Sequence, residues 1–166
     1  ARIVGELPST GLANSLWRDI KVVGHHMVVV SEAVDSRLQV FDLTRLRDYT
    51  TIAPPVTFST DTLLTGFGKA HNLAIHEEDS LVFVCGPNAV EGLLVYDFSA
   101  PDDPVLVGRW GEAYVHDAQV VTYNGPDVDH QGKRVAMVCS AGSFRILDVT
   151  DPSDITEISS GGHQPY

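Results

Sequence analysis

The sequence predicts an all-β protein, and more narrowly a β-propeller of about three four-stranded blades with the start of a fourth. Fourteen glycines and nine prolines punctuate short apolar runs, and long helical patterns are missing. The same motifs occur in the same order in three consecutive segments, with a period of roughly fifty residues. Each segment contains four short strand candidates, which is the content of one propeller blade.

Two markers keep the same period along the chain. The first is the aspartate that closes the third apolar run of each unit, at Asp42, Asp97 and Asp148. The second is the residue that opens the first run, at Arg18, His71, His116 and His163. The units therefore cover approximately residues 15–66, 67–112 and 113–162 of a single propeller domain, and residues 163–166 begin a fourth.

In the second unit the four strands are expected at about residues 71–75, 81–85, 93–97 and 105–110. Good turn formers separate them: Glu78-Asp79, Gly86-Pro87-Asn88 and the segment from Pro101 to Pro104. Tandem immunoglobulin-like sandwiches need about 100 residues per unit, and a β-solenoid needs shorter, more uniform rungs. Both alternatives fit this spacing less well than a propeller does.

Three blades are too few for a closed propeller. Known propellers contain about four to eight blades, and unpaired blade faces expose apolar surface to water. We therefore expect the chain to be a fragment of a larger propeller. The remaining blades are expected to come from another segment or from another copy.

The charge of the chain excludes some partners. Lys and Arg total 11 against 22 Asp and Glu, which gives a formal net charge of −11. Such a charge repels phosphate backbones, so the sequence predicts no nucleic-acid partner. Apolar runs of about eighteen residues are missing, so it also predicts no membrane span.

Several prominent residues are expected to serve the fold. Trp17 precedes the first strand and is expected to pack between blades. Cys85 and Cys139 end equivalent strands of adjacent units, farther apart than the roughly 7 Å limit for a disulfide, so both are expected to be buried free thiols. His25, His26, His76 and His130 have no repeat equivalents and are expected to be surface or packing residues. Carboxylates that end a strand before a turn cap local backbone N–H groups, which predicts a structural role for Asp42, Asp97 and Asp148.

Several strings together resemble the choice-of-anchor B family, whose members carry LVIVD-type repeats. These strings are SLWRDIKVVG, LQVFDLTRLRD, AHNLAIHEE, VHDAQVVTYNGPDVDHQGK and LDVTDPSD, and the repeat motif appears as LQVFD, LLVYD and FRILD. The resemblance covers nearly the whole chain, from about residue 15 to residue 164. It implies a secreted or cell-surface propeller, often anchored by a C-terminal sorting signal, and implies no established enzymatic activity.

The recurring histidines are the first candidate site. His71, His116 and His163 hold one repeat position, and equivalent first strands of a propeller converge near one mouth of the central channel. A polar residue follows each histidine, and the first unit has an arginine and an aspartate at the two equivalent positions. These residues are candidate ligand-binding residues: Arg18, Asp19, Asn72, Asp117 and Gln164. Three imidazoles can hold a transition metal. Two alternatives stay open: the rings bond the next blade's backbone, or Arg18 helps to bind an anion.

A loop in the third unit is the second candidate site. In GPDVDHQGK, oxygen-bearing Asp127, Asp129 and Gln131 alternate before Gly132, like the first half of a calcium loop. The residue twelve along is Val138 rather than a closing glutamate. The loop therefore predicts either a Ca²⁺ site completed by other loops or an acidic hairpin with Asx-type turns.

Together these features predict an extracellular binding or scaffold module rather than an enzyme. Its ligand, a small molecule, a glycan or a protein, is expected at one face of the propeller or at the channel mouth. The alternative is a metal-dependent oxidoreductase or hydrolase that uses the three recurring histidines.

Overall fold

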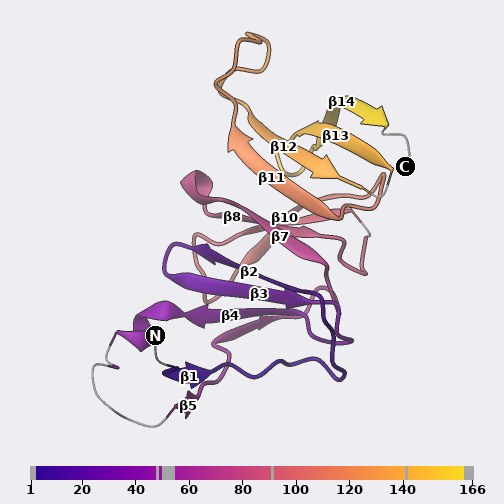
Figure 1. The fold of residues 1–166 in the computed structure, drawn as a ribbon. Helices are drawn as coiled ribbons and strands as arrows, with labels where there is room; N and C mark the ends of the chain where they lie inside the picture. Colours follow the sequence, from indigo (N-terminus) through magenta and orange to yellow (C-terminus); the bar gives the residue numbers. More distant parts are fainter. Residues whose placement is uncertain (1–2, 48, 50–54, 91, 141, 163–166) are drawn as a thin grey trace.

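The structure is a computed structural model that describes residues 3–47, 49, 55–90, 92–140 and 142–162. In these residues β-strands predominate, joined by turns and two short 3₁₀ helices. The strands form three four-stranded antiparallel sheets and one two-stranded parallel ribbon. The described chain is therefore all-β, as the sequence predicts (Figure 1).

Each four-stranded sheet is a meander whose strands pair in chain order. The first sheet comprises β2 (Arg18–Val23), β3 (His26–Ser31), β4 (Leu38–Asp42) and β6 (Thr62–Leu64). The second comprises β7 (Asn72–His76), β8 (Leu81–Cys85), β9 (Leu93–Asp97) and β10 (Val105–Trp110). The third comprises β11 (Asp117–Thr122), β12 (Arg134–Cys139), β13 (Ser143–Asp148) and β14 (Thr156–Gly162). The strands of the second unit are confirmed, with β7 displaced by one residue.

The remaining elements are two short 3₁₀ helices and a two-stranded ribbon. The 3₁₀ helix η1 (Leu43–Leu46) follows β4, and η2 (Glu77–Asp79) follows β7. Between η1 and β6 the strand β5 (Val56–Thr57) pairs in parallel with β1 (Gly5–Glu6). Among the described residues this ribbon has no counterpart in the other two units, and the repeat pattern does not predict it.

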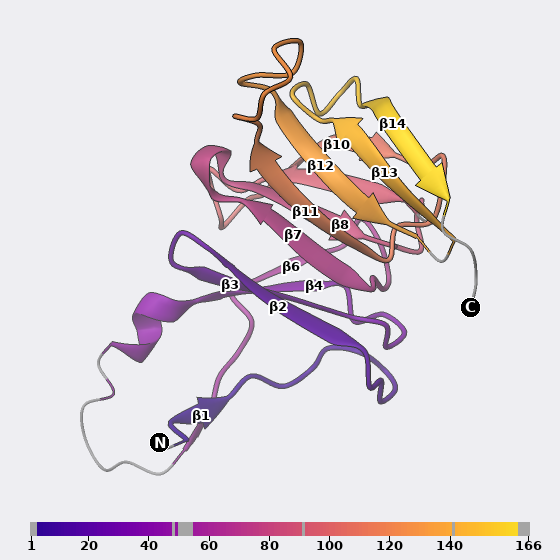
Figure 2. The same cartoon turned by 45° about the horizontal axis from the view of Figure 1, so that its top comes forward.

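The sheets stack in chain order, as the two views in Figure 1 and Figure 2 show. Their first strands meet, because β7 contacts β2 on one side and β11 on the other. The first two strands of each sheet pair in a comparable register. The residues opposite Asp19, Asn72 and Asp117 are, in the same order, Val30, Cys85 and Cys139.

Two apolar layers hold the stack together. One lies between the first and second sheets and includes Val28, Val40, Leu73 and Val84. The other lies between the second and third sheets and includes Phe83, Val95, Val120 and Leu147. Residues of β8 alternate between the two layers, so all five are buried. The second sheet is therefore covered on both faces.

The outer face of the third sheet is open in the described chain. Phe144 is 40% exposed there, and a groove of about 360 Å³ runs over Val121, Met137 and Ile146. Cys139 is also exposed, whereas its equivalent Cys85 is buried under the third sheet. The prediction of two free thiols is confirmed, but the predicted burial of Cys139 is wrong because no described sheet covers this face.

The outer face of the first sheet is half covered. Phe58 packs edge-on against Phe41 at a ring-centroid distance of 5.2 Å, and the Gln39 amide donates to the Pro8 carbonyl. On the first strand, Ile20 remains 56% exposed. The N-terminal segment and Phe58 therefore cover β4 on this face, whereas the first strand β2 stays open.

The aspartates that close the third strands have the predicted structural role. The Asp42 carboxylate accepts the backbone N–H of Thr44 at 2.8 Å and the Thr44 hydroxyl at 2.7 Å, and these bonds lower the pKa of Asp42. Equivalent backbone bonds run from Ser99 to Asp97 and from Thr150 to Asp148. Each strand therefore ends in a capped turn.

The described part of the chain contains no helix long and apolar enough to cross a membrane.

Candidate functional site

Two of the recurring histidines meet where the first strands begin. The rings of His71 and His116 lie with centroids 4.1 Å apart and planes inclined by 51°. Each residue immediately precedes its strand, β7 or β11, and Arg18 opens the equivalent strand β2. His163 and Gln164 lie outside the described residues. The stacking of the sheets thus brings together two of the three predicted histidines.

Glu32 holds the ring of His71 in place. Its Oε1 lies 2.6 Å from His71 Nδ1, and because a carboxylate only accepts, Nδ1 carries the proton. The other nitrogen, Nε2, is then left with a lone pair when the ring is neutral. Sequence reasoning missed Glu32. The available signal was an acidic residue directly after β3, at the end of the sheet where the first strands begin.

Trp17 continues this line of rings. Its ring centroid lies 6.0 Å from that of His71, and the residue is 61% exposed. The prediction that Trp17 packs between blades is therefore wrong, because the residue precedes β2 at the rim and not on a face. We call Trp17, His71 and His116 the ring row.

The polar residue after each ring position bonds to backbone. Asp19 accepts the N–H of Ile20 at 2.8 Å and, across the sheet boundary, the N–H of Leu73 at 2.9 Å. Asn72 and Asp117 accept the N–H of the residue that follows each of them. At the boundary between the first and second sheets, the bond to the backbone of the next first strand therefore comes from Asp19 and not from His71, which gives this carboxylate a role in the fold.

Arg18, the first-unit equivalent of the histidines, is exposed. Its guanidinium donates to the Ser9 hydroxyl at 3.0 Å, and its side chain lies at the rim beside the start of β2. The predicted ligand-binding roles of Arg18, Asp19, Asn72 and Asp117 stay predictions.

A small cavity adjoins the ring row. It encloses about 180 Å³, and its lining includes Glu32, Lys69, Asn88 and Tyr114. Gly86, with φ of +57°, permits its shape, because a Cβ there would lie 2.9 Å from the Tyr114 ring. Burial, followed by the nearby Glu32 charge, raises the pKa of Tyr114, so its hydroxyl stays a donor at neutral pH. We call this cavity the rim pocket.

The geometry of the rings bears on metal binding. Within the part of the chain that the structure describes, no group of three or more His, Cys, Asp or Glu side chains is placed to hold a metal. Two imidazoles on one tetrahedral zinc have centroids about 5 Å apart, given Zn–N bonds of about 2 Å. The rings of His71 and His116 are closer than this, so shared coordination requires one of them to turn.

The predicted calcium loop lies in the connection between β11 and β12, which runs from residue 123 to residue 133. Asp127 accepts the N–H of Asp129 at 3.1 Å, and the Gln131 amide donates to the Gly125 carbonyl at 3.0 Å. This is the Asx-type turn expected of the alternative reading. The Ca²⁺ site at Asp127, Asp129 and Gln131 stays a prediction.

A polar cluster joins the second and third sheets at the opposite end of the first strands. His76, only 5% exposed, lies 3.1 Å from the Thr122 hydroxyl through Nε2 and 3.2 Å from Asp79 through Nδ1. Arg134 donates to Asp79 through Nε at 2.9 Å, and this bond lowers the pKa of Asp79. His76 is therefore a buried packing residue. The sequence pattern does not predict that Thr122 and Asp79 are its polar partners.

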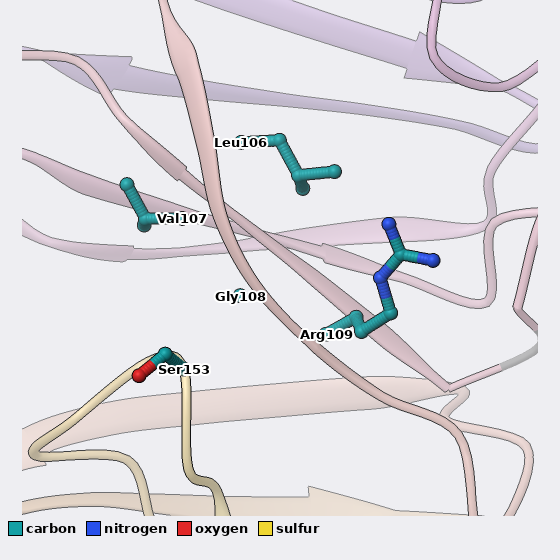
Figure 3. A pocket seen from close by; sticks show the side chains of 5 residues that line it. All are labelled: Leu106, Val107, Gly108, Arg109 and Ser153. Atoms are coloured by element: carbon teal, nitrogen blue, oxygen red, sulfur yellow. The ribbon is translucent and has the colours of Figure 1, made fainter.

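A further cleft lies on the outer strand of the second sheet, away from the ring row (Figure 3). It measures about 260 Å³ and opens between β10 and the loop that carries Ser153. Gly108 allows β10 and this loop to pack closely, because a Cβ at this position would lie 1.8 Å from the Pro152 carbonyl oxygen. Arg109 extends away from Ser153, so the charged group and the hydroxyl do not converge.

Comparison with known proteins gives no relative: no protein-family model, curated protein or solved structure matches this chain.

Proposed function

We propose that the three sheets are consecutive blades of an LVIVD-type β-propeller that acts as an extracellular binding or scaffold module. Three observations support this proposal. The sheets are four-stranded meanders stacked in chain order, their first strands are neighbours, and matching repeat positions fall beside one another. The resemblance to the choice-of-anchor B family suggests the cell surface as its location.

The ligand binds at the ring row and the rim pocket. The observation that carries this proposal is the contact of His71 with His116, fixed by the bond from His71 to Glu32. An exposed indole next to imidazoles offers flat apolar faces, while Glu32, Asn88 and Tyr114 offer hydrogen bonds. A glycan, which presents C–H faces and hydroxyl groups together, is the ligand class that fits this combination.

The binding proposal is tested with a panel of soluble oligosaccharides. Trp17 fluorescence reports binding, because Trp17 is exposed in the ring row whereas Trp110 is buried. We expect at least one oligosaccharide to change the emission, and we expect Trp17→Ala and His116→Ala to abolish its binding measured by calorimetry. Val105→Ala, an exposed apolar position on β10, is the control. Binding that survives both ring-row substitutions, or a panel without any binder, contradicts the proposal.

A metal-dependent enzyme is the second candidate function. The bond between Glu32 and His71 Nδ1 favours it, because a carboxylate on one imidazole nitrogen commonly orients the other toward a metal. Calorimetric titration with Zn²⁺, Ni²⁺ and Cu²⁺ tests it. This candidate requires one bound ion per chain, lost in His71→Ala and His116→Ala. Absence of binding in the unmodified protein removes the candidate and leaves the binding module.

A further inference from the structure

The rim pocket lies where segments of all three sheets meet. Glu32 directly follows β3 of the first sheet, Asn88 lies after β8 of the second, and Tyr114 precedes β11 of the third. Glu32 also bonds the ring of His71, so the rim pocket and the ring row share this side chain. A sugar ring that lies on the ring row can therefore place one of its substituents in the rim pocket.

The size of the rim pocket suits a single substituent. Its volume of about 180 Å³ is smaller than the roughly 300–1,000 Å³ of sites that bury a drug-sized ligand. Its walls are fixed, because the Asn88 amide oxygen accepts the backbone N–H groups of Gly68 at 2.8 Å and Lys69 at 3.2 Å. The Tyr114 ring packs directly on the backbone of Gly86. The pocket therefore needs little reorganisation to receive a small group.

The lining offers donors, an acceptor and an apolar wall. Because the Asn88 oxygen accepts two backbone N–H groups, the other end of the amide is the NH₂ donor. Burial and the Glu32 charge raise the pKa of Tyr114, which keeps its hydroxyl a second donor. The Glu32 carboxylate is the acceptor, since only its Oε1 bonds the ring row. Buried Ala70 and Pro87 supply the apolar wall.

The charges of the lining favour a neutral group. Lys69 and Glu32 both line the pocket, so it contains one cation and one anion. A carboxylate substituent would meet the Glu32 charge and the net charge of −11, whereas an ammonium substituent would meet Lys69. A hydroxyl would avoid both charges but would leave the apolar wall without a partner. A small neutral group with a polar and an apolar end fits best.

We propose that the rim pocket binds the acetamido group of an N-acetylated amino sugar whose ring lies on the ring row. This inference rests on the glycan-binding function proposed above. The acetamido oxygen accepts hydrogen bonds from Asn88 and Tyr114, its N–H donates to Glu32, and its methyl group packs on Ala70 and Pro87. The ring row thus selects for a sugar, and the rim pocket selects for the N-acetylated sugar.

A panel of matched oligosaccharides tests this selectivity by calorimetry. Oligomers of N-acetylglucosamine, N-acetylgalactosamine and N-acetylmannosamine are each compared with the oligomer of glucose, galactose or mannose that has the same linkage. The two members of a pair differ only in an acetamido group that replaces a hydroxyl. We expect at least one N-acetylated member to bind about tenfold more tightly than its counterpart, because it makes additional hydrogen bonds in the pocket.

Two substitutions separate the rim pocket from the ring row. Tyr114→Phe keeps the ring that packs on Gly86 and removes one donor, so it should weaken the N-acetylated sugar about fivefold and leave its counterpart unchanged. Trp17→Ala should abolish binding of both members, because it removes the face under the sugar ring. Tyr123→Phe removes a hydroxyl at the opposite end of β11 and is the matched control that should change neither. Unchanged melting temperatures verify that the variants fold.

Failure of this inference differs from failure of the proposed function. Equal affinity within every pair, or an equal loss of both members in Tyr114→Phe, overturns the acetamido assignment while glycan binding stands. Tighter binding of protonated glucosamine oligomers would show that Glu32 selects a cation, and tighter binding of oligogalacturonate would show that Lys69 selects a carboxylate. Either result also overturns the assignment. A panel without any binder contradicts the proposed function itself and removes this inference with it.

Discussion

At the scale of single residues, the first strands are linked by a carboxylate that reaches across a sheet boundary. Asp19 is mostly buried, accepts one backbone N–H of its own strand and one of the next sheet, and pairs with the Lys21 ammonium at 2.8 Å. A first strand is the edge of its sheet, so its outward N–H groups lack a ladder partner. Asp19 supplies that partner for Leu73.

Replacing this carboxylate should therefore destabilise the stack. Asp19→Ala leaves the Leu73 N–H to the weaker Asn72 contact and should reduce the free energy of unfolding by about 1–2 kcal/mol. Asp117→Ala controls for the bond to the following N–H, because Asp117 bonds only the N–H of Ala118 among the described residues, and Lys21→Met controls for the ion pair between Lys21 and Asp19. Denaturant unfolding of dilute protein measures all three, and a loss in either control equal to that in Asp19→Ala would contradict the cross-sheet role.

At the scale of the elements, the boundary between the second and third sheets carries an ion pair at the far end from the ring row. Asp79 follows β7 in η2, and Arg134 begins β12. The bond from Arg134, helped by the charges of Arg134 and His76, lowers the pKa of Asp79 below its ordinary 3.8. The ionised carboxylate thus stabilises the folded chain more than the unfolded chain.

This pair predicts a pH dependence of stability. Because the folded pKa of Asp79 is the lower one, its contribution is complete above about pH 4 and is lost as the pH falls through the folded value. Asp79→Asn should therefore flatten the fall in melting temperature between about pH 5 and pH 2. The effect should be modest because Asp79 is 46% exposed. Asp103→Asn, in the turn before β10, is the charge-matched control, and an equal flattening there would contradict the assignment.

The repeat pattern predicts the strands but not every contact between them. Strand bounds in the second unit follow from turn formers on either side of apolar runs, which are local signals. The meeting of His71 with His116 follows from their equivalent positions. The partner of His71 does not, because Glu32 is 39 residues away and reaches it only through the stacking of two sheets. The exposure of Trp17 and the burial of His76 likewise depend on which sheet end faces solvent.

At the scale of the whole molecule, stability is distributed unevenly over equivalent positions. Leu93 and Phe144 hold the same repeat position, yet Leu93 is fully buried by the third sheet and Phe144 lies on the open face. Leu93→Ala should cost about 2–5 kcal/mol of the free energy of unfolding. Phe144→Ala should cost less than about 1 kcal/mol in dilute protein, and a larger loss there would show that the outer face is covered even in the monomer.

The two-sided burial of the second sheet also sets the order in which the molecule opens. Each flanking sheet packs against only one other four-stranded sheet, so it can separate while breaking a single apolar layer between sheets, whereas the middle sheet must break two. Amide protons of β8 and β9 should consequently exchange with deuterium only through global unfolding. Those of β3 and β12 should exchange earlier, through partial opening from the ends of the stack, and hydrogen–deuterium exchange followed by mass spectrometry measures this gradient.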